Sequence, residues 1–168
     1  VHMIKQNLLK FLLEGIFTST ARDGSGKWLS ERNNKYFLRR CLYDGNAGVL
    51  YLLALFYKNK ITTSEKNLVD ECEKIINWLL IHEPTNDDQL PGLYVGETGV
   101  ALSILECLKS GIIQKEYWVD DYFSSVISAS PTTLDIIYGA AGQIVGSLKL
   151  LEFLNRKEYN CLDHLVMP

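Results

Sequence analysis

The 168-residue sequence lacks several features that mark specialised classes of protein. It has no excess of positive charge, because 17 Lys and Arg residues are set against 20 Asp and Glu residues and the net charge is −3. Nucleic acids and anionic membranes favour a basic face, so we expect neither as a partner. The longest apolar run, residues 49–57, is far shorter than the roughly 20 residues that span a bilayer. A soluble protein is therefore expected.

The sequence has only four cysteines, and none of them forms a C-x-x-C pair. The first residues do not follow the order of a basic, an apolar and a small-residue region that a secretory signal has. We therefore expect reduced thiols in a cytoplasmic protein. Cys161 and His164 have a spacing that would supply half a metal site at most. We interpret them as ordinary tail residues and expect no metal site in this chain.

The motifs of common nucleotide-binding and hydrolase folds are also missing. Residues 24–27 (GSGK) lack the spacing of a phosphate-binding P-loop, and no G-x-S-x-G nucleophile elbow occurs. The acidic pairs at residues 87–88 and 120–121 have no further acidic partners at helical spacing. We interpret both pairs as solvated surface groups.

What the sequence does contain is a strong helical pattern. Its apolar content of 47% and charged content of 22% are typical of a globular domain, and its length fits one domain. Apolar periodicity predicts helices, with a polar loop over residues 18–34 and a capping box formed by Thr62 and Glu65. The predicted helices cover residues 4–17, 49–57, 68–80, 100–108, 115–127 and 144–154.

One sequence motif occurs three times in this chain. A short apolar lead-in, a Gly-x-[Ala/Thr]-Gly turn and an apolar helix occur at residues 42–50, 93–101 and 136–144. The first glycines, Gly45, Gly96 and Gly139, are 51 and 43 residues apart. Such a period indicates a repeat architecture. Helices that are apolar on all sides alternate with one-sided helices, which favours two concentric layers, an all-α α/α toroid, over an open solenoid.

The glycine turns have two interpretations. In the first, the leading glycine allows a sharp turn and the second lets a neighbouring backbone approach. Helices that start at one shared mouth would then direct N–H groups and positive dipole ends at an anionic ligand. In the second, the glycines only permit close helix packing. Both apply to the same six residues, Gly45, Gly48, Gly96, Gly99, Gly139 and Gly142.

The three copies of the motif resemble the repeat motifs of the lanthionine synthetase cyclase family. The segment LYDGNAGV looks like the first repeat motif, GLYVGETGVA like the second and LDIIYGAAG like the third, and Trp28 and Leu29 fit the approach to the first. The likeness covers nearly the whole chain. It is closest to cyclase domains fused behind a dehydratase or kinase module.

This resemblance implies an α/α toroid of seven helical hairpins around a zinc ion. The family adds a peptide cysteine thiol to dehydroalanine or dehydrobutyrine in a ribosomal precursor peptide and so forms a thioether ring. The family's zinc ligands lie in later repeats, in Trp-Cys-x-Gly and Cys-His-Gly turns, and neither turn occurs here. Seven units of this period need on the order of 300 residues. We therefore expect residues 1–168 to be the N-terminal part of a single, incomplete cyclase domain, with zinc possible through residues beyond 168.

The resemblance also assigns candidate site residues. Asp135 matches the third-repeat aspartate that faces the central cavity, where a carboxylate would shuttle a proton or orient the thiol. The alternative is that Asp135 only caps the following helix. Asn46 and Glu97 occupy the variable slot of the turn and are expected to line the mouth, whereas Asp44 is expected to serve its turn.

Two other function classes stay open on sequence alone. A non-catalytic partial toroid would bind the precursor peptide or dock on a partner domain, and its open ends would expose apolar helix edges. A glycosidase built on the same type of fold would need two carboxylates at the inner mouth. Asp135 is the one credible carboxylate there, which disfavours the glycosidase.

Overall fold

The computed structural model describes residues 2–19, 22–23, 27–32, 34–62, 67–84 and 90–163. Most of these residues are helical, as the sequence predicts. The elements in chain order are α1 (His2–Ser19), β1 (Ser30–Arg32), β2 (Lys35–Phe37), α2 (Asn46–Lys58), α3 (Leu68–Ile81), α4 (Glu97–Ser110), α5 (Trp118–Ser128) and α6 (Ala140–Asp163). Among the described helices, none has the length and apolar character needed to cross a bilayer.

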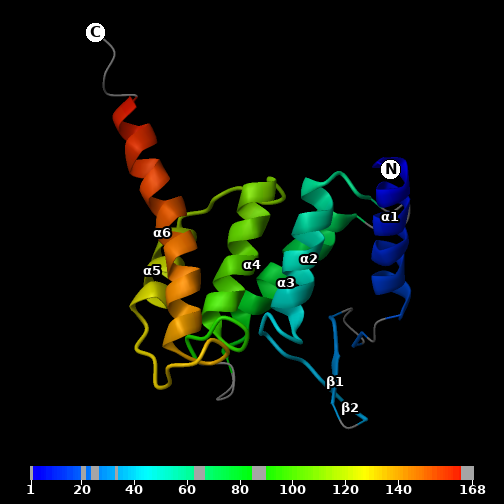
Figure 1. The fold of residues 1–168 in the computed structure, drawn as a ribbon, viewed down its shortest axis with the longest axis horizontal. Helices are drawn as coiled ribbons and strands as arrows, with labels where there is room; N and C mark the ends of the chain where they lie inside the picture. The colour runs from blue at the N-terminus through cyan, green and yellow to red at the C-terminus, as the bar shows by residue number, and fades with distance from the viewer. Residues whose placement is uncertain are drawn as a thin grey trace.

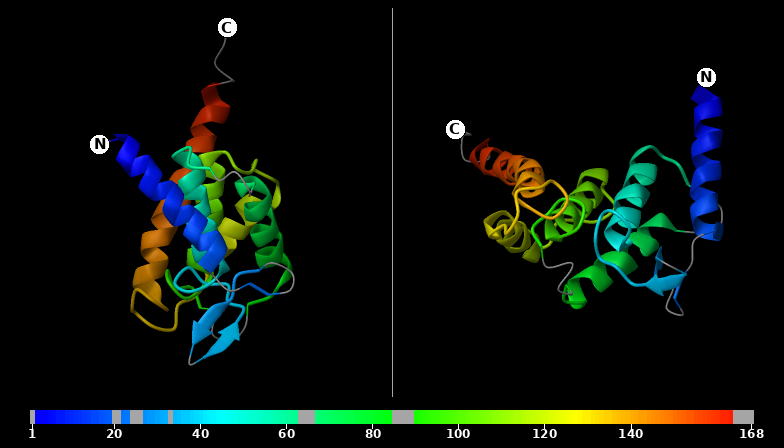
Figure 2. Two further views of the ribbon diagram at one scale, coloured as in Figure 1. Left: turned by 90° about the vertical axis from the view of Figure 1, so that its right-hand side faces the viewer. Right: turned by 60° about the horizontal axis from the view of Figure 1, so that its bottom comes forward.

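The helices form two layers. In the first layer α2, α4 and α6 stand side by side, run in the same direction and begin at the same end of the molecule (Figure 1). The second layer holds α3, which packs on α2 and α4, and α5, which packs on α4 and α6. Figure 2 shows α1 at one end of the row and α6 at the other. Helices of the two layers therefore alternate along the chain, as the apolar pattern predicts.

The core is centred on α4, which has a first-layer helix on each side. Its residues from Thr98 to Leu105 are all buried, and they pack against second-layer side chains such as Phe123. The sequence predicts that residues 49–57 are buried on all sides, but Leu52 in α2 is 38% exposed. That prediction is wrong because α2 has a first-layer helix against only one of its faces.

Local signals explain where several helices begin and end. The side chain of Asn67 accepts a hydrogen bond of 3.0 Å from the backbone N–H of Val69 and so caps α3. The predicted capping box differs from this, and its Glu65 lies outside the described residues. At the end of α4, Gly111 adopts the left-handed conformation, with φ of +78°, which is common just past a helix.

The segment between α1 and α2 is more ordered than the predicted loop. Thr18 and Ser19 still belong to α1, and β1 pairs antiparallel with β2 so that Ser30 lies opposite Phe37. Arg22 joins this region to α3 through an ion pair of 3.0 Å with Glu71. Its guanidinium also stacks on the ring of Trp28.

Several residues singled out in the sequence lie at the margins of the described helices or outside them. Residues 24–26, 87–88 and 164 lie outside the described part of the chain, and Cys161 falls in α6 without a described side chain. Of the acidic pair in the first turn of α5, Asp120 forms an ion pair with Lys115 and Asp121 is exposed.

Candidate functional site: the glycine rim

The three glycine turns have the same backbone geometry. We name them turn 1 (residues 39–48), turn 2 (residues 90–99) and turn 3 (residues 133–142). In each turn the first helical N–H donates to the carbonyl seven residues earlier: Asn46 to Arg39, Glu97 to Leu90 and Ala140 to Thr133, all at 2.9 Å. The sequence repeat is therefore a structural repeat.

The three turns also lie side by side. The N–H of Tyr43 in turn 1 donates to the carbonyl of Tyr94 in turn 2 at 3.0 Å. The N–H of Val95 in turn 2 donates to the carbonyl of Ile137 in turn 3 at the same distance. The starts of α2, α4 and α6 thus form one continuous edge, which we call the glycine rim (Figure 1).

The second glycine of a turn makes room for the turn before it. A Cβ atom built at Gly99 would lie 2.8 Å from the Cβ of Leu42, and one at Gly142 would lie 2.6 Å from the N of Leu93. Both distances are too short for real atoms. The packing interpretation of these glycines is therefore confirmed at Gly99 and Gly142.

The first glycine has a conformational reason in turn 2. Gly96 has a φ of +146°, and a Cβ there would also collide with the carbonyl of Leu90. Gly45 in turn 1 has a φ of −124°, and a Cβ on it would lie 2.7 Å from the carbonyl oxygen of Arg39. The two glycines therefore avoid different kinds of strain.

The N–H groups at the helix starts are used inside the turns. Asn46 and Ala47 donate to carbonyls of turn 1, and Ala140 and Ala141 donate to carbonyls of turn 3. In turn 2 the hydroxyl of Thr98 donates to the carbonyl of Pro91 at 2.5 Å. The expectation of free N–H groups directed at an anion is therefore wrong at these four residues.

Asp135 is exposed on turn 3, and its carboxylate is bonded within that turn. Oδ1 accepts from the N–H groups of Ile137 and Tyr138, and Oδ2 accepts from the hydroxyl of Thr133, all at 2.7 Å. The Thr133 hydrogen bond is the largest cause that lowers the pKa of Asp135 below its ordinary value. The carboxylate is consequently ionised at neutral pH and organises its own turn.

Glu97 lies at the start of α4 within a network of buried polar groups. Its Oε1 pairs with Nη2 of Arg40 at 2.8 Å, and its Oε2 accepts from the hydroxyl of Tyr122 at 2.7 Å. Arg40 also donates to the carbonyls of Leu79 and His82 at the end of α3. Burial, and then the charge of Glu97, raise the pKa of Tyr122 well above its ordinary value. The structure thus ties turn 1, α3, α4 and α5 together through Glu97.

Asn46 is fully buried rather than placed at an open mouth. Its amide donates to the carbonyls of Trp28 and Arg39, and its Oδ1 accepts from the N–H of Trp28. These bonds hold the 27–30 segment on turn 1. The placement gives Asn46 and Glu97 supporting roles beneath the rim, whereas the sequence predicts contact with a ligand.

The exposed side chains of the rim are mostly aromatic and aliphatic. Tyr43, Tyr94 and Ile137 occupy the same position two residues before the first glycine, and all three are exposed, as is Tyr138. Sequence reasoning on glycines and carboxylates passed over this row. The signal was present, because a tyrosine lies one or two residues before the first glycine of every turn.

The described cysteines do not form a zinc site. Cys41 donates from its thiol to Oδ1 of Asp44 at 3.0 Å, and burial is the main cause that raises its pKa to about 11. Cys107 is hydrogen-bonded to Cys72 in the core, and this contact and burial raise its pKa. The thiols of Cys41 and Cys107 are thus held protonated, whereas zinc binds thiolate. No cluster of three or more His, Cys, Asp or Glu side chains suited to a metal occurs within the described ranges.

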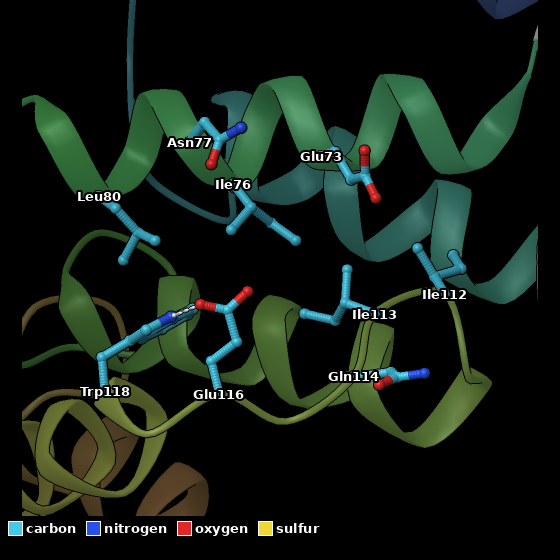
Figure 3. Close-up of a pocket in the computed structure, with 9 residues that line it drawn as sticks. All are labelled: Glu73, Ile76, Asn77, Leu80, Ile112, Ile113, Gln114, Glu116 and Trp118. Atoms are coloured by element: carbon cyan, nitrogen blue, oxygen red, sulfur yellow. Dashed lines mark hydrogen bonds between the residues drawn. The ribbon is translucent and has the colours of Figure 1, made fainter.

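Two cavities accompany this arrangement. One of about 550 Å³ lies away from the rim, between α3 and the segment before α5, and its polar wall includes Glu73 and Glu116. Figure 3 shows Glu116 accepting a hydrogen bond from the indole of Trp118, at 2.9 Å. The other, of about 360 Å³, borders turn 1 between Gly48, Leu52 and Trp28.

The description of the glycine rim rests on the hydrogen bonds that recur in turns 1 to 3 of this chain. No family model, no curated protein and no solved structure matches the chain.

Proposed function

We propose that this chain is part of a lanthionine synthetase cyclase domain that forms thioether rings in a ribosomal precursor peptide. Its three glycine-turn units would be the first of a closed α/α toroid. The observation that supports the proposal is the convergence of turns 1 to 3 on one rim through the hydrogen bonds from Tyr43 to Tyr94 and from Val95 to Ile137. The motifs that resemble the family are the residues that build this rim.

In this proposal the rim binds the precursor peptide. Tyr43, Tyr94 and Ile137 offer exposed apolar and aromatic surface, and tyrosine combines apolar area with a hydroxyl that hydrogen-bonds a backbone. An extended peptide that carries dehydroalanine and cysteine would lie along this row. The units of one toroid would then present the peptide to a common centre.

Asp135 would act as an orienting carboxylate. A general acid or base works best with a pKa close to the operating pH, and the pKa of Asp135 is lowered from the ordinary carboxyl value. An ionised carboxylate would instead accept a hydrogen bond from the incoming thiol or from the peptide backbone. This favours the orienting role over the proton shuttle.

Zinc would activate the thiol in a complete domain, but the described residues of this chain do not fit that role. Cys41, Cys72 and Cys107 are buried, and no metal cluster lies among the described residues. Further repeats, a dehydratase or kinase module and the precursor peptide are the partners that the proposal requires, in the cytoplasm.

Peptide binding by the chain itself tests the proposal. Fluorescence anisotropy with a labelled peptide that contains dehydroalanine and cysteine should show saturable binding, and Tyr94→Ala should weaken it several-fold. Tyr117→Ala is the matched control, because Tyr117 is 91% exposed on the approach to α5, away from the rim. Equal loss in both variants, or no binding by the parent chain, would remove the support for a cyclase.

A thiol-alkylation assay adds a second readout, because ring formation consumes the cysteine thiol without a change in mass. We expect no consumption by the isolated chain. Ring formation by this chain alone would contradict the proposal that it is incomplete.

The second candidate is a non-catalytic module that binds the precursor peptide. The observation that favours it is that both carboxylate oxygens of Asp135 are already bonded within turn 3. Such a module would bind peptides with serine or with dehydroalanine equally well, and Asp135→Asn would not change either affinity. A cyclase would prefer the dehydrated peptide and lose that preference in the variant.

A further inference from the structure

The two ends of the repeat array have complementary shapes. Within the chain, the residue three positions before the first glycine packs against the second glycine of the following turn: Leu42 against Gly99, and Leu93 against Gly142. The same contact is half complete at each end. Turn 3 has the apolar residue, Ile136, and turn 1 has the glycine, Gly48.

Turn 1 has the glycine of this contact, Gly48, but among the described residues no apolar side chain of another turn packs against it. A Cβ built at Gly48 would meet only atoms of Leu42, in its own turn, and the third nearest of these is already 3.9 Å away. The cavity of about 360 Å³ described above lies at this position, lined by Gly48, Val49, Leu52 and Trp28. We call it the Gly48 notch.

Turn 3 has the apolar side chain of this contact, Ile136, but within the described ranges no glycine of a following turn lies against it. Ile136 is 46% exposed, whereas the equivalent Leu93 is 9% exposed. The apolar surface continues along α6 through Ile144, Val145, Leu148 and Leu151, all of which are exposed. We call Ile136 and these four residues the α6 face. Contiguous apolar surface of this kind marks an interaction site.

We propose that the α6 face of one copy docks into the Gly48 notch of a second copy, head to tail. Ile136 would enter the notch as Leu42 and Leu93 enter the spaces at Gly99 and Gly142, and α6 would lie along Leu52 of α2. The contact is thus a third example of an interface that the chain already makes twice. Interfaces between unlike faces of identical chains build closed rings or open filaments. The proposal rests on the exposed α6 face and the Gly48 notch, and it is independent of thioether chemistry.

The mass of the protein in solution tests this proposal. Sedimentation equilibrium should give a mass above the 19.1 kDa of one chain, and the mass should rise with concentration. Leu148→Glu damages the α6 face and Leu52→Glu damages the notch, and each variant alone should be monomeric. Both side chains are exposed, so the fold should survive, which circular dichroism checks.

Mixing the two variants gives the sharpest result. The intact notch of Leu148→Glu can accept the intact α6 face of Leu52→Glu, so an equimolar mixture should form a one-to-one dimer. Ile81→Glu, at a 75% exposed position of α3, is the control and should associate as the parent does. A parent chain that stays monomeric at all concentrations overturns the proposal. So does a Leu52→Glu variant that still associates, because the contact would then join two α6 faces symmetrically.

Discussion

Helices α4 and α6 follow the same motif and the same turn geometry, yet they lie in opposite environments. Counted from the first glycine, Ala101, Leu102 and Leu105 of α4 are 0%, 7% and 2% exposed, and the equivalent Ile144, Val145 and Leu148 of α6 are 60%, 42% and 64% exposed. The turn is therefore a local property of the sequence, whereas burial of the helix depends on a neighbour. In repeat proteins each unit is stabilised mainly by adjacent units.

The two helices also differ in their polar anchors. Glu97, the residue after the first glycine of turn 2, reaches Arg40 and Tyr122. Ala140 takes the equivalent position in turn 3 and has no polar side chain. The central unit is thus fixed by both apolar contacts and buried charge, and the terminal unit by fewer contacts.

The same truncation at equivalent positions tests this difference most strongly. Leu105→Ala should lower the free energy of unfolding by about 3 to 5 kcal/mol, because it removes a buried side chain and leaves a cavity. Leu148→Ala should change it by about 0.5 kcal/mol or less. Urea denaturation of both variants, below the concentration at which copies associate, measures the pair. Similar losses would show that α6 is covered in solution.

Removing the polar anchor should have the next largest effect. Glu97→Ala gives α4 the alanine that α6 has at the equivalent position, Ala140. The substitution leaves the buried Arg40 without its carboxylate partner, so the free energy of unfolding should fall by about 3 kcal/mol. Denaturation at neutral pH checks this value. Lys149→Ala, at an exposed position of α6, is a suitable reference with an expected change near zero. An unaltered stability of Glu97→Ala would mean that the Arg40 pair is solvated.

The third equivalent residue, Asn46 in turn 1, should give an intermediate effect. Asn46→Ala removes the side chain that is hydrogen-bonded to the backbone N–H and C=O of Trp28 in the interior, which should cost about 2 kcal/mol. Hydrogen exchange should also accelerate selectively at the N–H of Trp28. Faster exchange across the whole molecule would instead indicate global loss of structure.

The smallest effect is expected at Asp135, where the exposed carboxylate stabilises turn 3. Its pKa is lowered in the folded chain, so its contribution is complete above the ordinary carboxyl pKa and is lost as the pH falls through the lowered value. Asp135→Asn should therefore lower the melting temperature near neutral pH. The difference from the parent should shrink as the pH falls through the lowered pKa, because the parent then loses the same contribution. Thermal melting between pH 2 and pH 7 measures it. A difference between variant and parent that stays the same from neutral to acid pH would exclude this contribution.

The presence and type of the helices were largely predictable because their signals are local, although α2, α4 and α6 begin three or four residues before the predicted ranges. The glycines at 45, 96 and 139 precede the first helical residues of α2, α4 and α6, and the amphipathic pattern marked α3. Each of these predictions uses residues within a few positions of one another.

Other features depend on partners far apart in the chain. Arg40 is bonded to a carboxylate 57 residues away, and no local pattern reports this. The hairpin of β1 and β2 joins two strands of three residues through Asn34 at a φ of +58°, which is too short for a periodic signal. For the same reason, sequence alone predicted open positions for Asn46 and Glu97, whose partners lie in other segments.

The bonds of Asp135 have a consequence for contacts made by the outer side of turn 3. In turns 1 and 2 a backbone N–H, that of Tyr43 or of Val95, donates to the next turn, whereas in turn 3 the N–H groups of Ile137 and Tyr138 donate to the Asp135 carboxylate. The side chain thus occupies donors that an added unit would use, much as charged residues protect the outer strand of a sheet from further pairing. A unit or a second copy that docks on turn 3 through these donors must first displace the aspartate, so that contact would be held reversibly.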